Sequence, residues 1–291
     1  MNTKDLQYFH QLASLKNFSK VAATFQVSQP TVTVAIQRLE KQFAVPLIVR
    51  DRSHHAVELT SFGRQLDRHV VNILNELELA QKEAAHTQMK QVRFGLPPII
   101  GNYYFPSLVP DLLQRHLLAR LEIVERGSNE TLKQLRSGEL DMALLGSLSP
   151  LEYDQLAAST IVKMPFGILV AKDSDLAAKA ESGVFLRDLK KRSFVALDEK
   201  FIHHQAFRRV ANAAHVRPRI IYRTADVHVL GALVAKHIGI AFLTSLAAAI
   251  DPQTVLIPLL DDQQPLFYIS KVRREQTILD GIKKELWQQL G

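Results

Sequence analysis

Side chains that could read DNA bases gather between Ser28 and Arg38. Small hydroxyl and amide side chains alternate there with apolar ones, and no acidic residue appears before Glu40. Gln can pair bidentately with adenine in the major groove, and the methyl groups of Thr and Val can touch the thymine methyl. The chemistry that this pattern favours is base recognition. The residues expected to contact DNA here are Ser28, Gln29, Pro30, Thr31, Thr33, Val34, Gln37 and Arg38.

Two short helices joined by a tight turn would position these side chains. Phe18, Ala22 and Phe25 recur at spacings of four and three, which predicts the first helix. Ser28 is a favourable N-cap, and Pro30 suits a first helical turn because it needs no bonded N–H. The apolar stripe of the second helix comprises Val32, Ala35, Ile36 and Leu39. The pattern predicts a helix-turn-helix at about residues 18–37, and the alternative is a small helical bundle with a solvated polar face.

The flanking segments complete a small domain. Residues 4–15 have apolar side chains at helical spacing and predict a preceding helix. Residues 45–49 and 56–59 read as two short strands of a wing, from which Arg50 and Arg52 could reach phosphates or the minor groove. His54 and His55 lie in the same loop without partner ligands at suitable spacing, so solvated histidines are expected there and no metal site.

A long helix follows from Thr60, a credible cap, to about Gln88. Its apolar residues alternate by four and three, as in a coiled coil: Phe62, Leu66, Val70, Ile73, Leu77, Ala80 and Ala84. A stripe on so long a helix needs a partner. We expect Leu66, Val70, Ile73 and Leu77 to form a dimer contact, and the alternative is packing onto the second domain of the same chain.

Composition sets the limits for the whole chain. The 291 residues are 47% hydrophobic, contain no Cys and carry a net charge of +7, with a pI of about 9.5. Residues 1–68 hold 9 basic and 5 acidic side chains, a net of +4, so more than half of the excess lies in the segment expected to meet DNA. No apolar run matches a signal peptide or a membrane span of roughly 20 residues. We therefore expect a soluble cytoplasmic protein with no membrane partner.

From Val92 onward, strands and helices alternate, which predicts α/β layers with largely parallel sheets. The expected strands are residues 92–96, 121–125, 142–145, 166–171, 194–197, 219–222, 240–243, 255–257 and 267–272. The expected helices are residues 102–114, 129–136, 201–215, 227–236 and 275–290. Two lobes are expected, one of about residues 91–162 and 267–291 and the other of about 163–266.

The first 65 residues resemble the winged helix-turn-helix of LysR-type transcriptional regulators. The matching positions are Leu6 to Phe9, Phe18-Ser19, Ala22-Ala23, Val27 to Thr33, Ile36, Leu39-Glu40, Leu47, Arg50, Leu59-Thr60 and Gly63. The resemblance implies an oligomer that binds inverted-repeat promoter DNA, with a linker helix that pairs with its copy in a second subunit. Three features depart from the family pattern: Ala44 replaces a helix-ending Gly, Ile48 replaces a Phe, and the stretch from Arg50 to Leu59 is longer.

The rest of the chain is similar to the effector domain of the same family, a two-lobed fold like the type II periplasmic binding proteins. Residues 132–143 match a sequence motif of this domain that runs from a helix into a strand. Residues 233–235 and 239–241 match a second motif. The implied organisation is a winged helix-turn-helix at residues 1–60, a linker and dimerisation helix at 61–90, and an effector-binding domain at 91–291.

The resemblance places a small-molecule ligand in the crevice between the lobes. Backbone N–H groups of Gly101, Asn102 and Tyr103 could hold an anion at a helix start. One of two adjacent histidines, His203 or His204, could pair with a carboxylate and make binding pH-sensitive. Ile99 stands where many relatives have Ser or Thr, which removes a hydroxyl contact. The expected effector-binding residues are Pro98, Ile99, Gly101, Asn102, Ser128, Asn129, Gly146, Phe201, His203, His204 and Thr224.

Residues 18–30 and 95–106 look like those of malolactic fermentation regulators, which would imply a malate-type effector. Two alternatives are a metabolite-binding or catalytic α/β protein with an appended DNA-binding domain, and a transport binding protein. The sequence shows no Gly-rich phosphate loop, nucleophile elbow or paired metal-ligand motif. We therefore expect no enzyme activity and no cofactor, and the partners expected are double-stranded DNA, a small carboxylate effector and further copies of the chain as a homodimer or homotetramer.

Overall fold

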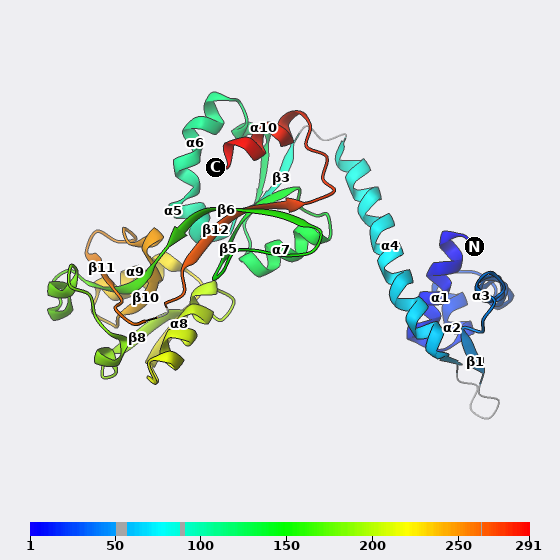
Figure 1. The fold of residues 1–291 in the computed structure, drawn as a ribbon, viewed down its shortest axis with the longest axis horizontal. Coiled ribbons are helices and arrows are strands. Elements are labelled where there is room, and N and C mark those ends of the chain that lie inside the picture. Colours follow the sequence, from blue (N-terminus) through cyan, green and yellow to red (C-terminus); the bar gives the residue numbers. More distant parts are fainter. Residues whose placement is uncertain (51–56, 88–90, 263) are drawn as a thin grey trace. The chain divides into compact units, whose positions relative to one another are not determined.

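The structure, a computed structural model, describes residues 1–50, 57–87, 91–262 and 264–291. The chain forms two compact units, residues 1–88 and 89–291, and each is described by itself (Figure 1). The first unit contains, in order, α1 (Thr3–Leu15), α2 (Phe18–Thr24), α3 (Gln29–Phe43), β1 (Ile48–Arg50), β2 (Val57–Leu59) and α4 (Ser61–Thr87). The two strands pair antiparallel, from Ile48 opposite Leu59 to Arg50 opposite Val57. The predicted winged helix-turn-helix is therefore confirmed, with shorter strands than expected.

Local side chains fix the ends of these helices. Asn17 caps α2 by accepting a bond from the Lys20 backbone N–H at 2.9 Å. Thr60 caps α4, because its Oγ1 accepts from the Gly63 N–H at 2.9 Å. Gly63 is required by close packing, since a Cβ there would lie 2.2 Å from the carbonyl oxygen of Leu47. Ala44 ends α3 in the left-handed conformation, with φ 55° and ψ 26°, which glycine adopts at lower cost.

The core of the first unit includes part of the apolar stripe on α4 that was expected to form the dimer contact. Leu66 and Val70 are buried in the same apolar cluster as Phe9 and Leu12 of α1. Leu66 and Val70 therefore pack inside their own chain, where α1 covers them, and they are not available to a second subunit. Farther along α4, Ile73 is 43% exposed and Leu77 is 41% exposed, so only this half of the stripe is open to a second subunit.

The larger unit begins with a five-stranded mixed sheet in the order β4-β3-β5-β12-β6. Its strands are β3 (Val92–Gly95), β4 (Leu121–Val124), β5 (Met142–Ser147), β6 (Leu156–Met164) and β12 (Phe267–Arg274). Its helices are α5 (Pro98–Tyr103), α6 (Phe105–Gln114), α7 (Ser128–Arg136) and α10 (Gly281–Gln289). Helices α6 and α10 lie on one side of the sheet and α7 on the other (Figure 1). Leu112 of α6 and Leu286 of α10 belong to one apolar cluster, and Leu135 of α7 belongs to another.

The second lobe holds two small sheets. Its strands are β7 (Phe166–Ala171), β8 (Ser193–Leu197), β9 (Arg219–Thr224), β10 (Ala241–Thr244) and β11 (Thr254–Pro258). Strand β7 lies between β10 and β11, and β8 pairs with β9. Two helices complete it, α8 (Ile202–Ala213) and α9 (Val227–Ala235). The two-lobed α/β fold is thus confirmed.

Several details differ from the sequence-based expectations. The sheets are not largely parallel, because β12 returns to the first sheet antiparallel to both of its neighbours, and β7 is antiparallel to β10 and β11. Strand β6 was not expected at all, because its sequence is rich in small residues and lacks clear alternation. The single helix expected at residues 102–114 is two helices that meet at Tyr104, with Pro106 in the first turn of the second. The last helix starts at Gly281 instead of residue 275.

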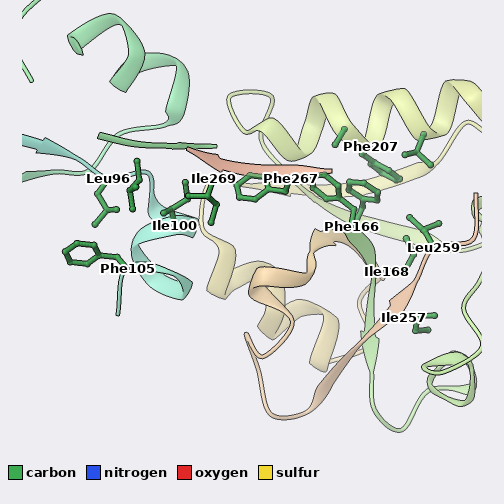
Figure 2. Packing of buried hydrophobic residues seen from close by; sticks show 14 of the residues in the cluster. Leu96, Ile100, Phe105, Phe166, Ile168, Phe207, Ile257, Leu259, Phe267 and Ile269 are labelled. Atoms are coloured by element: carbon green, nitrogen blue, oxygen red, sulfur yellow. The ribbon is translucent and has the colours of Figure 1, made fainter. Parts of the chain in front are cut away.

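A continuous apolar core connects the two lobes of this unit. Figure 2 shows Leu96, Ile100 and Phe105 at one end and Ile168, Ile257 and Leu259 at the other, all within one cluster. Phe166 and Phe267 lie between them, with ring centroids 6.1 Å apart and planes at 85°. Both residues start strands that follow crossings between the lobes. The aromatic pair therefore marks the junction of the lobes.

No described helix combines the length and apolar character that a membrane crossing requires. Among the same residues, no three His, Cys, Asp or Glu side chains come together in a group that could hold a metal ion.

Candidate nucleic-acid interface and ligand cavity

The expected DNA-contacting residues of α3 lie on one accessible face. Val32, Ala35, Ile36 and Leu39 are buried beneath it. Val34 is 48% exposed, and Thr33 is half-buried. The remaining six are exposed: Ser28, Gln29, Pro30, Thr31, Gln37 and Arg38. The amphipathic pattern therefore turns the polar face outward, as a groove-reading helix requires.

Hydrogen bonds orient the start of this face. Ser28 occupies the N-cap position, but its hydroxyl bonds the Thr31 hydroxyl at 2.8 Å instead of a backbone N–H. Ser19 in α2 donates to Oε1 of Gln29 at 3.4 Å. This contact holds the Gln29 amide at the first turn of α3, and its N–H groups remain available to an acceptor such as adenine N7.

Arg38 has a role that sequence reasoning missed. Its Nη2 lies 2.6 Å from Oδ1 of Asp5, a carboxylate buried in the first turn of α1. The guanidinium thus ties α3 to α1, and half of its surface stays exposed. Glu40, two residues farther along α3, accepts bonds from the backbone N–H groups of Leu47 at 2.8 Å and Ile48 at 3.4 Å, so it anchors the start of the wing. Arg50 ends β1, whereas Arg52, His54 and His55 lie outside the described residues.

The larger unit contains a cavity of about 560 Å³ between the two lobes. Such a volume falls in the usual range of small-molecule sites. The first lobe contributes Pro97, Pro98, Ile99, Ile100, Gly127, Ser128, Asn129, Glu130 and Lys133. The second lobe and the strand that returns from it contribute Lys200, Phe201, Ile202, His203 and Phe267. Six expected effector residues line this cavity: Pro98, Ile99, Ser128, Asn129, Phe201 and His203.

The other five expected residues lie elsewhere. Gly146 lines a neighbouring cavity of about 170 Å³, which shares Ser128, Asn129 and Ile202 with the larger one. The remaining four line neither cavity: Gly101, Asn102, His204 and Thr224.

Their contacts explain these positions. Helix α5 begins at Pro98, so the Gly101 N–H lies inside the helix and bonds the Pro97 carbonyl at 2.8 Å instead of marking a helix start. Asn102 contacts His228 at 3.3 Å, and His204 contacts Arg223 at 3.2 Å. Thr224 accepts a bond from the Asp226 N–H at 3.0 Å.

Lys133 and Lys200 are cavity residues that the sequence analysis did not single out. Both are exposed and line the cavity from opposite lobes. Helices α7 and α8 also start at its wall without a side-chain cap bond, so their first N–H groups and dipoles favour an anion. Among the described residues that line the cavity, Glu130 is the one carboxylate, and its Oε1 lies 3.4 Å from Nε of Arg126. The arrangement suits a ligand with an apolar body and a carboxylate.

His203 differs from the expected pH switch. Its side chain is 3% exposed, and burial lowers its pKa from 6.5 to about 3. At neutral pH this burial favours the uncharged imidazole. The sequence left open whether His203 or His204 would pair with a carboxylate, and the apolar surroundings of His203 disfavour its charged form.

A winged helix-turn-helix with an outward polar face, and a two-lobed unit with an anion-favouring cavity, define a ligand-responsive DNA-binding regulator. Comparison with known proteins agrees. Residues 3–64 match the bacterial regulatory helix-turn-helix protein of the lysR family, and residues 85–291 match the LysR substrate binding domain. The chain belongs to the LysR family of transcriptional regulators, as the sequence resemblance indicated.

Individual relatives extend over nearly the whole chain. The malolactic fermentation system transcriptional activator of Lactococcus lactis subsp. lactis (strain IL1403) is 32% identical over 98% of this chain and 96% of its own length. The uncharacterised helix-turn-helix regulator YwbI of Bacillus subtilis (strain 168) is 30% identical over 99% and 97%. These relatives are regulators, so the hypothesis of an enzyme with an appended DNA-binding domain is not supported.

Solved structures share the fold. Full-length BenM has a TM-score of 0.58 at 19% identity and covers 100% of this chain and 95% of its own. Full-length CbnR in complex with its target DNA has a TM-score of 0.55 at 19% identity and covers 99% and 98%.

Proposed function

We propose that this regulator binds inverted-repeat promoter DNA in the cytoplasm as a homodimer or homotetramer, and that a small carboxylate changes this binding. The observation that supports DNA reading most directly is the exposed polar face of α3, with the Gln29 amide held by Ser19. The exposed side chains Ile73 and Leu77 on α4 support assembly with a second copy. We propose the domain organisation of residues 1–60, 61–90 and 91–291 for these three tasks.

The test of base reading uses the full-length protein and sites selected from random-sequence DNA. Gln29→Ala should weaken binding to the selected site by about 5- to 150-fold, which corresponds to one bidentate pair of roughly 1–3 kcal/mol. Binding to unrelated DNA should change little, because it depends on phosphate contacts. The matched control is Gln7→Ala, an exposed Gln on α1. Equal losses on both kinds of DNA would reject the role of Gln29.

The proposed effector is a malate-type carboxylate. Lys133, Lys200 and the N-termini of α7 and α8 support a carboxylate, and the malolactic activator among the relatives makes malate the first compound to test. Malate should raise the melting temperature of the full-length protein, because a ligand that binds the native state stabilises it. Lys133→Ala and Lys200→Ala should reduce the shift. No shift with any small carboxylate would reject this part of the proposal.

A further inference from the structure

His203 has a buried ring nitrogen that no described residue bonds. It lies in the first turn of α8 and lines the 560 Å³ cavity. Its Nε2 is buried and has no hydrogen-bond partner among the residues that the structure describes. A buried donor or acceptor without a partner is unfavourable, because it has lost its hydrogen bonds to water. Such a group at the wall of a ligand cavity is therefore a candidate contact for the ligand.

Aromatic rings fix the direction of this imidazole. Phe166 lies edge-on, with centroids 5.4 Å apart and planes at 85°. Phe267 lies 5.5 Å away, with its plane tilted by 42°. These are the two rings at the junction of the lobes (Figure 2). Because neither ring accepts or donates a conventional hydrogen bond, they hold His203 in place without satisfying it.

The chemistry of a neutral imidazole limits what can satisfy it. One ring nitrogen donates and the other accepts, and the tautomer decides which is which. A carboxylate only accepts, whereas a hydroxyl group both donates and accepts, so a hydroxyl can bond Nε2 in either tautomer. For the carboxylate of the same ligand the cavity offers other groups, namely Lys133, Lys200 and the N-termini of α7 and α8.

We propose that His203 determines specificity by bonding a hydroxyl group of the effector, so that the cavity selects hydroxycarboxylates over the corresponding deoxy compounds. This inference rests on the proposed carboxylate effector and adds the group that distinguishes one carboxylate from another. His203 also contacts the two phenylalanines of the lobe junction, so the same bond places the effector against that junction.

The test compares malate with succinate, which lacks only the hydroxyl group, by calorimetric titration of the full-length protein. Wild-type protein should bind malate about tenfold or more tightly than succinate. His203→Leu should bring the two affinities within about threefold of each other, mainly by weakening malate. His203→Gln, which keeps an amide near the Nε2 position, should restore part of the preference. His204→Leu is the matched control and should leave the ratio unchanged, because His204 does not line the cavity.

Two results would overturn the role of His203: equal affinities of the wild-type protein for the two acids, or a preference that persists in His203→Leu. Either result leaves the carboxylate effector standing. Binding of neither acid would instead reject the malate-type effector and this inference with it. His203→Phe is a second apolar replacement, so that a folding defect of His203→Leu, detected by circular dichroism, does not decide the question.

Discussion

Arg38 of α3 and Asp5 of α1 form an ion pair with a 2.6 Å separation across 33 residues of sequence. Asp5 is 1% exposed, and its second carboxylate oxygen accepts a bond from the Asn2 backbone N–H at 3.0 Å. One carboxylate thus closes the capping box of α1 and holds the base-reading helix against α1. The orientation of α3 depends on this pair as well as on the apolar core.

Arg38→Ala should lower the free energy of unfolding of the first unit by roughly 1–3 kcal/mol, because it leaves a buried carboxylate with one of its two donors. Urea unfolding followed by far-UV circular dichroism measures the change. Lys41→Ala, an exposed substitution on the same helix, should stay within about 0.5 kcal/mol of wild type. Equal effects of the two substitutions would show that the pair contributes nothing measurable.

Ala44→Gly should stabilise the first unit by roughly 1 kcal/mol, because Ala44 holds the left-handed conformation with φ 55°. The same unfolding experiment detects the gain. Ala23→Gly lies within α2 and should lower stability instead, since glycine disfavours a helical backbone. A loss at both positions would argue against strain at Ala44.

Residues that act through local structure were predictable from the sequence. The pattern around Ser28 and Pro30 located the second helix, and Thr60 marked the start of α4. Ala44 was also located at the end of the second helix, where the family resemblance places a Gly. Each of these features depends on a few neighbouring residues, because the types of those residues determine which backbone conformation is favoured.

Features that depend on distant contacts were not predictable. Nothing near Arg38 identifies Asp5 as its partner, and nothing near Leu66 shows that α1 covers it. Lys133 and Lys200 meet at one cavity only because the lobes face each other. The burial of His203 likewise arises from Phe166 and Phe267, which are remote in sequence.

The two halves of the α4 stripe should respond differently to charge. Ile73→Asp with Leu77→Asp should reduce the assembly to smaller species while the first unit stays folded, because both side chains are exposed. Light scattering coupled to size-exclusion chromatography measures the mass. Leu66→Asp should instead unfold the first unit, since Leu66 belongs to its core. An unchanged mass in the double variant would exclude this part of α4 from the subunit contact.

His203 should make the stability of the larger unit depend on pH. Its pKa is about 3 in the folded protein and near 6.5 in an unfolded chain. Between these values the unfolded state binds more protons, so the free energy of unfolding is unaffected above about pH 6.5 and falls as the pH decreases toward 3. At about pH 5 the loss from this residue is on the order of 2 kcal/mol.

Trp287 is the only tryptophan of the chain and lies in α10, so its fluorescence follows urea unfolding of the larger unit alone. Between about pH 7.5 and pH 5, wild-type protein should lose about 2 kcal/mol more than His203→Leu. His204→Leu is the control, because His204 contacts Arg223 at 3.2 Å and does not line the cavity. This variant should lose as much stability as wild type. If His203→Leu shows the same loss as wild type, the imidazole is protonated in the folded protein or already exposed to water. The neutral donor and acceptor on which effector selection depends would then not exist.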